Sequence, residues 1–299
     1  MSLELSNIFC KNNSAVITGA SSGIGRAASI KCAKHGMNVW MLDIDSDDLS
    51  KAVQIVKSHA TNDQLIQDVI CDVSNAESMQ KISEQVYAHP KTISVNFLMN
   101  NAAVQTGGGP LSISMETFMN TFGVNTLGPI HGCQAFIPKM QEKDVPGLIV
   151  NTGSKQGITA PPGNLTYNVS KSALKTWTEG LEHELRQSRK DGGKLYAALL
   201  IPGWVNTSIV LKQMRAEAKG NGEVFNKESV FFHEDKPAEG AWMPMQAIEF
   251  MMEELEKGRF YIVCPDNEVD RHTDNLRMTW AMVSYCLMCF NWLLFLSSM

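Results

Sequence analysis

The sequence lacks an excess of basic residues. Lysine and arginine together number 26, against 31 aspartates and glutamates, so the formal net charge is −5. A protein that binds nucleic acid through its phosphates usually presents clustered lysine and arginine. The composition therefore predicts no nucleic-acid partner.

Cysteine is scattered, and no metal-binding motif is complete. The seven cysteines are odd in number and lie mostly inside apolar runs, which is typical of reduced thiols packed in the core of an intracellular protein. Cys286 and Cys289 form a C-x-x-C pair, but no second pair and no nearby histidine accompanies them. We therefore predict no metal site.

The first residues also lack the long apolar stretch of a secretory signal peptide. Together with the scattered cysteines, this favours a cytoplasmic protein. The chain shows no internal repeat and no flexible linker. Its 299 residues are enough to bury a full core and fall within the range of one large α/β domain.

Short apolar runs alternate with longer amphipathic segments, which indicates parallel strands joined by crossover helices. The predicted strands are residues 15–18, 38–42, 65–71, 93–99, 147–151, 194–201 and 260–263. The predicted helices are 24–35, 46–59, 75–88, 112–142, 165–190 and 238–257. We predict an α/β Rossmann fold over residues 1–265, with a doubly wound parallel sheet of about seven strands and helices on both faces.

Two segments depart from this alternation. Residues 204–236 form a long connection rich in large apolar side chains, and such a connection is either a binding loop or a surface excursion with a small core of its own. Residues 266–299 form an extension, in which 278–299 carries no charge. This tail is borderline in length for crossing a bilayer, so a membrane anchor, an interface helix and a non-native tail all remain open.

A glycine-rich turn follows the first predicted strand and precedes the first predicted helix. Gly19 permits a tight turn, while Gly23 and Gly25 let the backbone and the helix N-terminus approach a diphosphate closely. The helix dipole favours such an anion. We predict that the turn binds a dinucleotide through Gly19, Ser21, Ser22, Gly23, Ile24 and Gly25.

Asp43 closes the second predicted strand, close to 20 residues beyond the turn. A carboxylate at this position accepts hydrogen bonds from the adenosine ribose and repels a 2′-phosphate. This predicts NAD as the cofactor, with NADP less favoured. The alternative is that Asp43 only caps the following helix, although Asp45 and Ser46 could do so instead.

Tyr167 and Lys171 are four residues apart in a predicted helix and therefore share one face. A neighbouring cation favours the phenolate, which would let Tyr167 exchange a proton near neutral pH. A tyrosine and a lysine with this spacing also occur on many helices by chance. The surrounding motifs are therefore needed to decide the matter.

Those motifs resemble the short-chain dehydrogenase/reductase family, in its compact single-domain form. The resemblance covers about residues 12–265 and implies an NAD- or NADP-dependent alcohol dehydrogenase or carbonyl reductase. The family's catalytic residues match Asn125, Ser154, Tyr167 and Lys171. Its further cofactor contacts match Asp72, Val73, Asn101, Ala102, Ala103, Tyr167, Lys171, Pro202, Gly203, Val205 and Thr207. Ala103 stands where the family usually has glycine.

The resemblance implies a role for each catalytic residue. Ser154 would donate a hydrogen bond to the substrate oxygen, and Tyr167 would transfer the proton. Lys171 would lower the Tyr167 pKa and hold the nicotinamide ribose, and Asn125 would position a water between Lys171 and solvent. Family members are commonly homodimers or homotetramers, which would pair segments 112–142 and 165–190.

Two other functions are compatible with a Rossmann fold. A sensor or scaffold of the same fold would bind NAD(H) without turnover, but it would not need all four catalytic residues. An epimerase or dehydratase of a related fold would usually have a larger C-terminal domain and a differently spaced glycine turn. The predicted substrate residues are Gln156, Ile158, Trp204 and Met214, and the large apolar side chains favour a hydrophobic alcohol or ketone.

Overall fold

The computed structural model describes residues 4–61, 63–209, 211, 212, 214, 218, 236–267, 269, 270 and 272–279. Within them, seven parallel strands form one sheet in the order β3-β2-β1-β4-β5-β6-β7. The strands are β1 (Ser14–Thr18), β2 (Asn38–Asp43), β3 (Ile66–Ile70), β4 (Val95–Asn100), β5 (Gly147–Thr152), β6 (Leu195–Ile201) and β7 (Tyr261–Val263). The predicted doubly wound parallel sheet is therefore confirmed.

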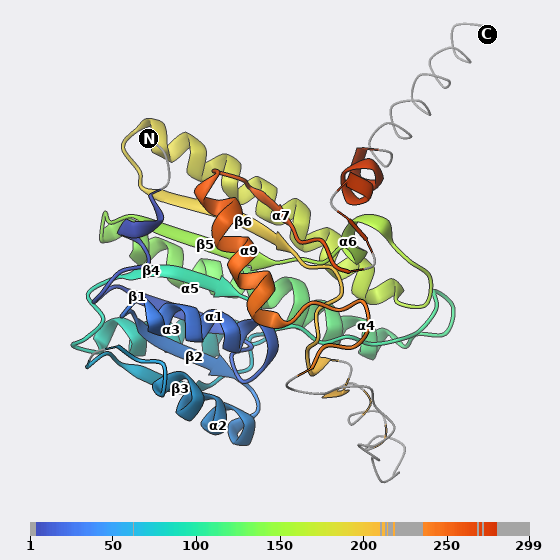
Figure 1. Cartoon of the computed structure of the whole chain (residues 1–299), viewed down its shortest axis with the longest axis horizontal. Coiled ribbons are helices and arrows are strands. Elements are labelled where there is room, and N and C mark those ends of the chain that lie inside the picture. Colours follow the sequence, from blue (N-terminus) through green and yellow to red (C-terminus); the bar gives the residue numbers. More distant parts are fainter. Residues whose placement is uncertain are drawn as a thin grey trace, which may run out of the picture.

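Helices cover both faces of this sheet. They are α1 (Gly23–Lys34), α2 (Ser46–Lys57), α3 (Ala76–Ala88), α4 (Met115–Phe122), α5 (Gly128–Glu142), α6 (Gln156–Thr159), α7 (Leu165–Lys190) and α9 (Pro244–Glu256), together with a short 3-10 turn, η1 (Leu5–Asn7). Residues 272–279 are also helical. In Figure 1, α1 and α9 lie over the near face of the sheet and α5 lies behind it.

The prediction of one continuous helix over 112–142 is wrong, because a π-helical segment divides this region into two α-helices. This segment, η2 (Gly123–Leu127), joins α4 to α5, and the Gly128 N–H bonds to the Gly123 carbonyl. Such π segments widen one turn of a helix and often occur at functional sites. Periodicity alone cannot reveal one extra residue within a single turn, and this one contains Asn125.

Three helices begin with a side-chain cap. Asp45 accepts a hydrogen bond from the Asp48 N–H at the start of α2. Asn75 and Ser114 make the equivalent bonds at the starts of α3 and α4. Each cap satisfies an N–H group that has no partner within its helix. These local signals explain why the predicted helix starts lie close to the observed ones.

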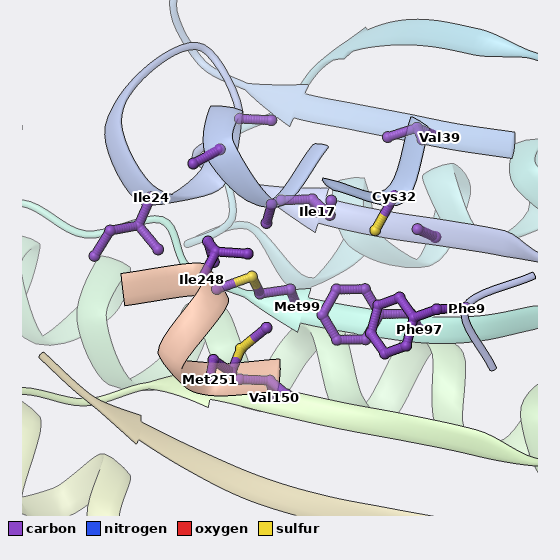
Figure 2. Packing of buried hydrophobic residues seen from close by; sticks show 14 of the residues in the cluster. Phe9, Ile17, Ile24, Cys32, Val39, Phe97, Met99, Val150, Ile248 and Met251 are labelled. Carbon is purple, nitrogen blue, oxygen red and sulfur yellow. The ribbon is translucent and has the colours of Figure 1, made fainter. Parts of the chain in front are cut away.

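Two apolar cores lie on opposite faces of the sheet. One joins α1, α2 and α9 to β1, β2, β4 and β5, and the other joins α3, α5 and α7 to the same central strands. Figure 2 shows the first core, where Phe97 of β4 packs beside Phe9 and below Ile17 and Cys32. The Phe9 and Phe97 ring centroids are 4.9 Å apart. Four of the five described cysteines are buried.

Replacing Phe97 by alanine is expected to destabilise the fold by about 3–5 kcal/mol, because it removes a fully buried ring and leaves a cavity. Urea unfolding followed by circular dichroism measures this difference. Ile93→Ala is the matched control, because Ile93 is 71 % exposed just before the same strand, and it should change the free energy of unfolding by less than about 0.5 kcal/mol. Equal losses in the two variants would contradict the packing described here.

Candidate active site

A cavity of about 1130 Å³ opens at the carboxyl ends of the strands. It lies where the strand order reverses, since β1 is flanked by β2 on one side and by β4 on the other. In parallel α/β sheets, ligands bind in the crevice that forms at this reversal. The position of the cavity therefore follows from the strand order alone.

The glycine turn forms one wall of the cavity. Gly19 has φ of +64°, a conformation that residues with a Cβ rarely adopt. A Cβ at Gly23 would lie 2.9 Å from the Thr207 methyl group, and one at Gly25 would collide with the Gly19 carbonyl. The turn can therefore bring its backbone close to a ligand only with glycine at these positions.

The N-terminus of α1 points its free N–H groups toward this wall. The first turn of α1 contains no acidic residue, and the Ser22 side chain makes no capping hydrogen bond to the helix. Its hydroxyl instead accepts a hydrogen bond of 2.8 Å from Ser208. Unpaired N–H groups and the helix dipole together favour an anion at this position.

A pair of loops is tied together across the strand reversal. The Thr18 hydroxyl, at the end of β1, accepts hydrogen bonds of 2.9 and 3.0 Å from the N–H groups of Asn101 and Ala102, which follow β4. The Asn101 amide donates in return to the Thr18 carbonyl at 3.2 Å. These bonds fix the two sides of the crevice relative to each other.

Asp43 is buried at the end of β2 and faces the same cavity. Its two carboxylate oxygens accept hydrogen bonds from the N–H groups of Ser21, at 3.0 Å, and Asp45, at 3.1 Å. The cap of α2 is Asp45, so the alternative that Asp43 serves as the helix cap is wrong. Each oxygen keeps a lone pair for a further donor.

Lys212, which is not among the residues predicted from the sequence, lies at the glycine turn. Its ammonium donates to the Ser21 hydroxyl at 3.1 Å and lies 4.0 Å from a carboxylate oxygen of Asp48. The pKa of Asp45 is lowered mainly by the hydrogen bond from the Asp48 backbone. Burial opposes this shift, and the charge of Lys212 adds to it. No local pattern could reveal this contact, because Lys212 and Ser21 are 191 residues apart in the chain.

Tyr167 and Lys171 lie together on α7, as their spacing predicted. The Lys171 side chain is 2 % exposed, and its ammonium donates to the Thr152 carbonyl at 2.8 Å, at the end of β5. The ammonium lies 5.7 Å from the centroid of the Tyr167 ring. The contact with Thr152 anchors this face of α7 to the end of the central sheet.

Burial dominates the titration of both groups. It lowers the pKa of Lys171 to about 7. It raises the pKa of Tyr167 to about 12, and a hydrogen bond with Ser154 acts in the opposite direction. The resemblance implies that Lys171 lowers the Tyr167 pKa. In the chain by itself, burial raises that pKa instead, and the Lys171 ammonium is itself desolvated and donates to Thr152.

Asn125 occupies the π-helical segment and is fully buried. Its carbonyl oxygen accepts a bond of 2.8 Å from the Val104 N–H, and its amide donates to the Val104 carbonyl at 2.9 Å and to the Ser170 hydroxyl at 3.1 Å. Both amide hydrogens are therefore used within the protein. The side chain ties the loop after β4 to α7, and the water-positioning role that the resemblance implies stays a prediction.

Most predicted site residues line the one cavity. Among the predicted catalytic and cofactor residues, these are Gly19, Ser22, Gly23, Ile24, Asp43, Asp72, Val73, Asn101, Ala102, Ala103, Ser154, Tyr167, Lys171, Pro202, Gly203, Val205 and Thr207. Ser21, Gly25 and Asn125 do not line it; they support its walls through the contacts described above.

The predicted substrate residues divide into two groups. Gln156, Trp204 and Met214 line the cavity. Ile158 does not; its side chain packs against Leu199, Ile201 and Val263 at the edge of the sheet. The short helix α6, which the sequence pattern does not predict, turns this residue inward.

A family comparison agrees with this geometry. The model of the short chain dehydrogenase family matches residues 13–218, which is more than half of the chain. The chain belongs to the short-chain dehydrogenase/reductase family. This is a family of oxidoreductases, so the coarse class of the protein follows from membership.

Individual relatives cover much of the chain. The 1-deoxy-11-beta-hydroxypentalenate dehydrogenase of Streptomyces avermitilis is 27 % identical over 271 residues, which is 90 % of each chain. A family member from Burkholderia phymatum, solved in complex with NAD, is 31 % identical with a TM-score of 0.71, covering 86 % of this chain and 89 % of that one. A metagenomic short-chain oxidoreductase in complex with NADP is 27 % identical with a TM-score of 0.59, covering 66 % and 85 %.

The segment predicted as a possible membrane anchor, 278–299, lies almost wholly outside the described residues. Among the described residues, no helix has both the length and the apolar character needed to cross a membrane. The same part of the chain contains no cluster of three histidine, cysteine or acidic side chains that could hold a metal. Cys286 and Cys289 also lie outside it.

Lys171→Met is expected to stabilise the protein at pH 6, by about 1–4 kcal/mol, because a buried ammonium is replaced by an apolar chain. The folded chain binds fewer protons at Lys171 than the unfolded chain between pH 7 and the ordinary value of 10.5. The free energy of unfolding of the wild type therefore rises with pH between these two values. The variant has no lysine to titrate, so its stability advantage over the wild type shrinks.

Thermal or urea unfolding between pH 6 and pH 10 measures this difference. Lys175→Met is the matched control, since Lys175 lies on the same helix and makes a partly exposed ion pair with Glu179 at 2.8 Å. Its effect should stay within about 1 kcal/mol. A Lys171→Met advantage that grows with pH would show that burial does not control this lysine.

Proposed function

We propose that the protein is an NAD-dependent oxidoreductase that transfers hydride between nicotinamide and a secondary alcohol or ketone. The observation that carries the proposal is the convergence of Ser154, Tyr167 and Lys171 on the cavity that also contains the glycine turn and Asp43. A proton-transfer group and an anion cradle in one cavity are what a dinucleotide-dependent dehydrogenase requires.

The residues of the cavity fit a dinucleotide. The glycine turn packs so closely against its neighbours that only residues without a Cβ fit, and the first turn of α1 carries no acidic residue that would compete for its N–H groups. Asp43 is held by two backbone N–H groups and still has acceptor capacity for ribose hydroxyls. A bound nicotinamide supplies the hydride chemistry, while this chain supplies binding, orientation and the proton.

Tyr167 is the proposed proton donor and acceptor for the substrate oxygen. Its phenol is buried and hydrogen-bonded with Ser154, so Ser154 also helps to hold charge that develops on that oxygen. Lys171 brings a titratable ammonium to the same face of α7, with its pKa lowered by burial to about 7. Asn125 keeps the loop after β4 against α7, which fixes the wall opposite these groups.

The substrate is proposed to be an apolar alcohol or ketone of moderate size. Trp204, Ile209, Leu211 and Met214 line the cavity beyond the proposed proton-transfer groups. Sites for small molecules are mostly apolar, with a few polar groups that fix orientation. Gln156 is one such polar group at the same wall.

Turnover explains the buried lysine better than a sensor or scaffold role does. A desolvated ammonium costs stability, and groups with strongly shifted pKa values concentrate at catalytic sites. A protein that only binds NAD(H) would gain no chemical benefit from placing Lys171 beside Tyr167. Measuring turnover distinguishes the two functions.

A homodimer or homotetramer is proposed through α4 and α7, within the two segments that the sequence indicated. Met115 and Met119 of α4 and Leu165 and Val169 of α7 are exposed apolar side chains. Apolar groups gathered on neighbouring elements are typical of association surfaces. The oligomeric state in solution tests this proposal.

Tyr167→Phe is expected to lower kcat for a secondary alcohol by about 10²–10⁴-fold, because it removes only the hydroxyl that carries the proton. The dissociation constant of NADH, measured by fluorescence, should stay within about twofold of wild type. Absorbance of reduced nicotinamide follows turnover. Unchanged turnover in a folded variant that binds NADH would rule out Tyr167 as the proton-transfer group.

Asp43→Ser is expected to weaken NADH binding by about 10–100-fold, because it removes a charged acceptor for the ribose. The same change should strengthen binding of NADPH, since Lys212 is left beside Ser21 without the Asp43 charge. The double variant Asp43→Ser/Lys212→Gln should lose that gain.

Asp47→Asn is the matched control for this pair of variants. It removes the same charge from an exposed position in the first turn of α2, and both dissociation constants should stay unchanged. Tighter wild-type binding of NADPH than of NADH would contradict the NAD preference, while leaving the dehydrogenase proposal standing.

A further inference from the structure

A buried cluster of three charged side chains lies in the wall of the cavity beside Ser154, where Lys155 and Asp266 themselves line the cavity. Lys155, which follows Ser154, places its ammonium 3.1 Å from an Asp266 carboxylate oxygen and 2.6 Å from an Asp274 carboxylate oxygen. The lysine side chain is 13 % exposed, and the two aspartate side chains are 6 % and 4 % exposed. This cluster takes no part in the chemistry proposed above.

The cluster is costly unless each member is well satisfied, because burying a charge loses its hydration. Asp266 accepts further hydrogen bonds from the N–H groups of Trp204, at 3.1 Å, and Val269, at 2.7 Å. Asp274 is less well compensated: burial raises its pKa and Asp266 adds to that rise, while Lys155 and, to a smaller extent, Arg277 oppose it. Lys155 therefore bridges the two carboxylates with its single ammonium.

The cluster connects three segments that are far apart in the sequence. The Lys155 N–H bonds to the Pro202 carbonyl at 3.2 Å, so the residue after Ser154 is held at both its backbone and its ammonium. Gly203 packs so closely that a Cβ there would collide with the Asp266 carboxylate. Asp266 and Asp274 come from the C-terminal extension, which begins at 266.

The same extension contributes to the wall of the cavity. Asp266, Val269 and Arg277 all line it, although the catalytic domain predicted from the sequence ends at residue 265. Figure 1 shows the short helix of residues 272–279 standing close to α6, beside the catalytic end of the sheet. The extension and the turn that contains Ser154 therefore meet at Lys155.

We propose that the Lys155–Asp266–Asp274 cluster docks the described part of the C-terminal extension, residues 266, 267, 269, 270 and 272–279, as a wall of the substrate cavity, and that Lys155 is thereby a positioning residue for Ser154. The inference rests on the proposed function for its kinetic consequence. Its structural part, the docking of the extension, stands independently of which substrate is turned over.

The structural part predicts local opening of the extension when the lysine charge is removed. Trypsin cleaves after Arg277, which lies in the exposed final turn of the described helix. Cleavage of a locally opened segment follows the population of the open form. In full-length Lys155→Met, cleavage after Arg277 should be at least about 10-fold faster than in wild type.

The kinetic part predicts a defect in substrate use at an intact cofactor site. Lys155→Met should raise KM for the alcohol and lower kcat/KM by about 10–100-fold, because both the cavity wall and the Ser154 turn lose their anchor. The dissociation constant of NADH should change by less than about threefold. Lys155→Arg, which keeps the charge, should recover most of kcat/KM and of the resistance to trypsin.

Two further variants keep the test interpretable. Asp274→Asn removes one charge and retains the Lys155–Asp266 pair, so it should give an intermediate effect even if Lys155→Met folds poorly. Lys194→Met removes a surface ion pair with Asp144 at 2.8 Å, far from the cavity lining, and should leave cleavage and kinetics unchanged.

Unchanged cleavage after Arg277 in folded Lys155→Met and Asp274→Asn would overturn the docking. Faster cleavage with unchanged kcat/KM would show that the extension docks without positioning Ser154, which would overturn the second part. If wild type binds NADH but oxidises no alcohol, the proposed function fails, and the cleavage comparison still decides the docking.

Discussion

β1 and β4 pair in parallel at the centre of the sheet, and the connections that follow them lead to opposite faces. The chain after β1 turns into α1, whereas the chain after β4 leads toward α4 and α5. Because the two connections diverge, a crevice must open between them, and the hydrogen bonds from Asn101 and Ala102 to Thr18 fix its width. The glycine turn, Asp43 and the face of α7 that carries Tyr167 are all positioned relative to this crevice.

The site is assembled from polar groups that the fold buries at a cost. Lys171 is fully desolvated and gives one hydrogen bond to Thr152, while Asp43 holds two backbone N–H groups. Asn125 uses its whole amide to join a loop to α7. Such buried networks hold a single arrangement only when their members are well satisfied, and this rigidity is what a proton-transfer site needs.

Much of the fold was readable from the sequence, because its signals are local. Most of the seven strands are short apolar runs, with β3 at the edge as the exception, and α7 begins and ends at the predicted residues. The observed structure differs from the predicted elements at two short helical segments. The π segment at Asn125 inserts a wider turn into an otherwise regular helix, and α6 turns Ile158 away from the cavity, although both sequences carry ordinary apolar spacing.

The sequence by itself determined the parallel sheet, the glycine turn, and the placement of Tyr167 and Lys171 on one helix face. These depend on side-chain periodicity, on glycine's lack of a Cβ and on i,i+4 geometry, all of which act within a few residues. Only the tertiary structure decided that Lys212 reaches the glycine turn, that burial governs the titration of Tyr167, and that Lys155 joins Ser154 to the C-terminal extension. These depend on contacts between residues about 100 or more positions apart and on desolvation, which exist only once the chain has folded.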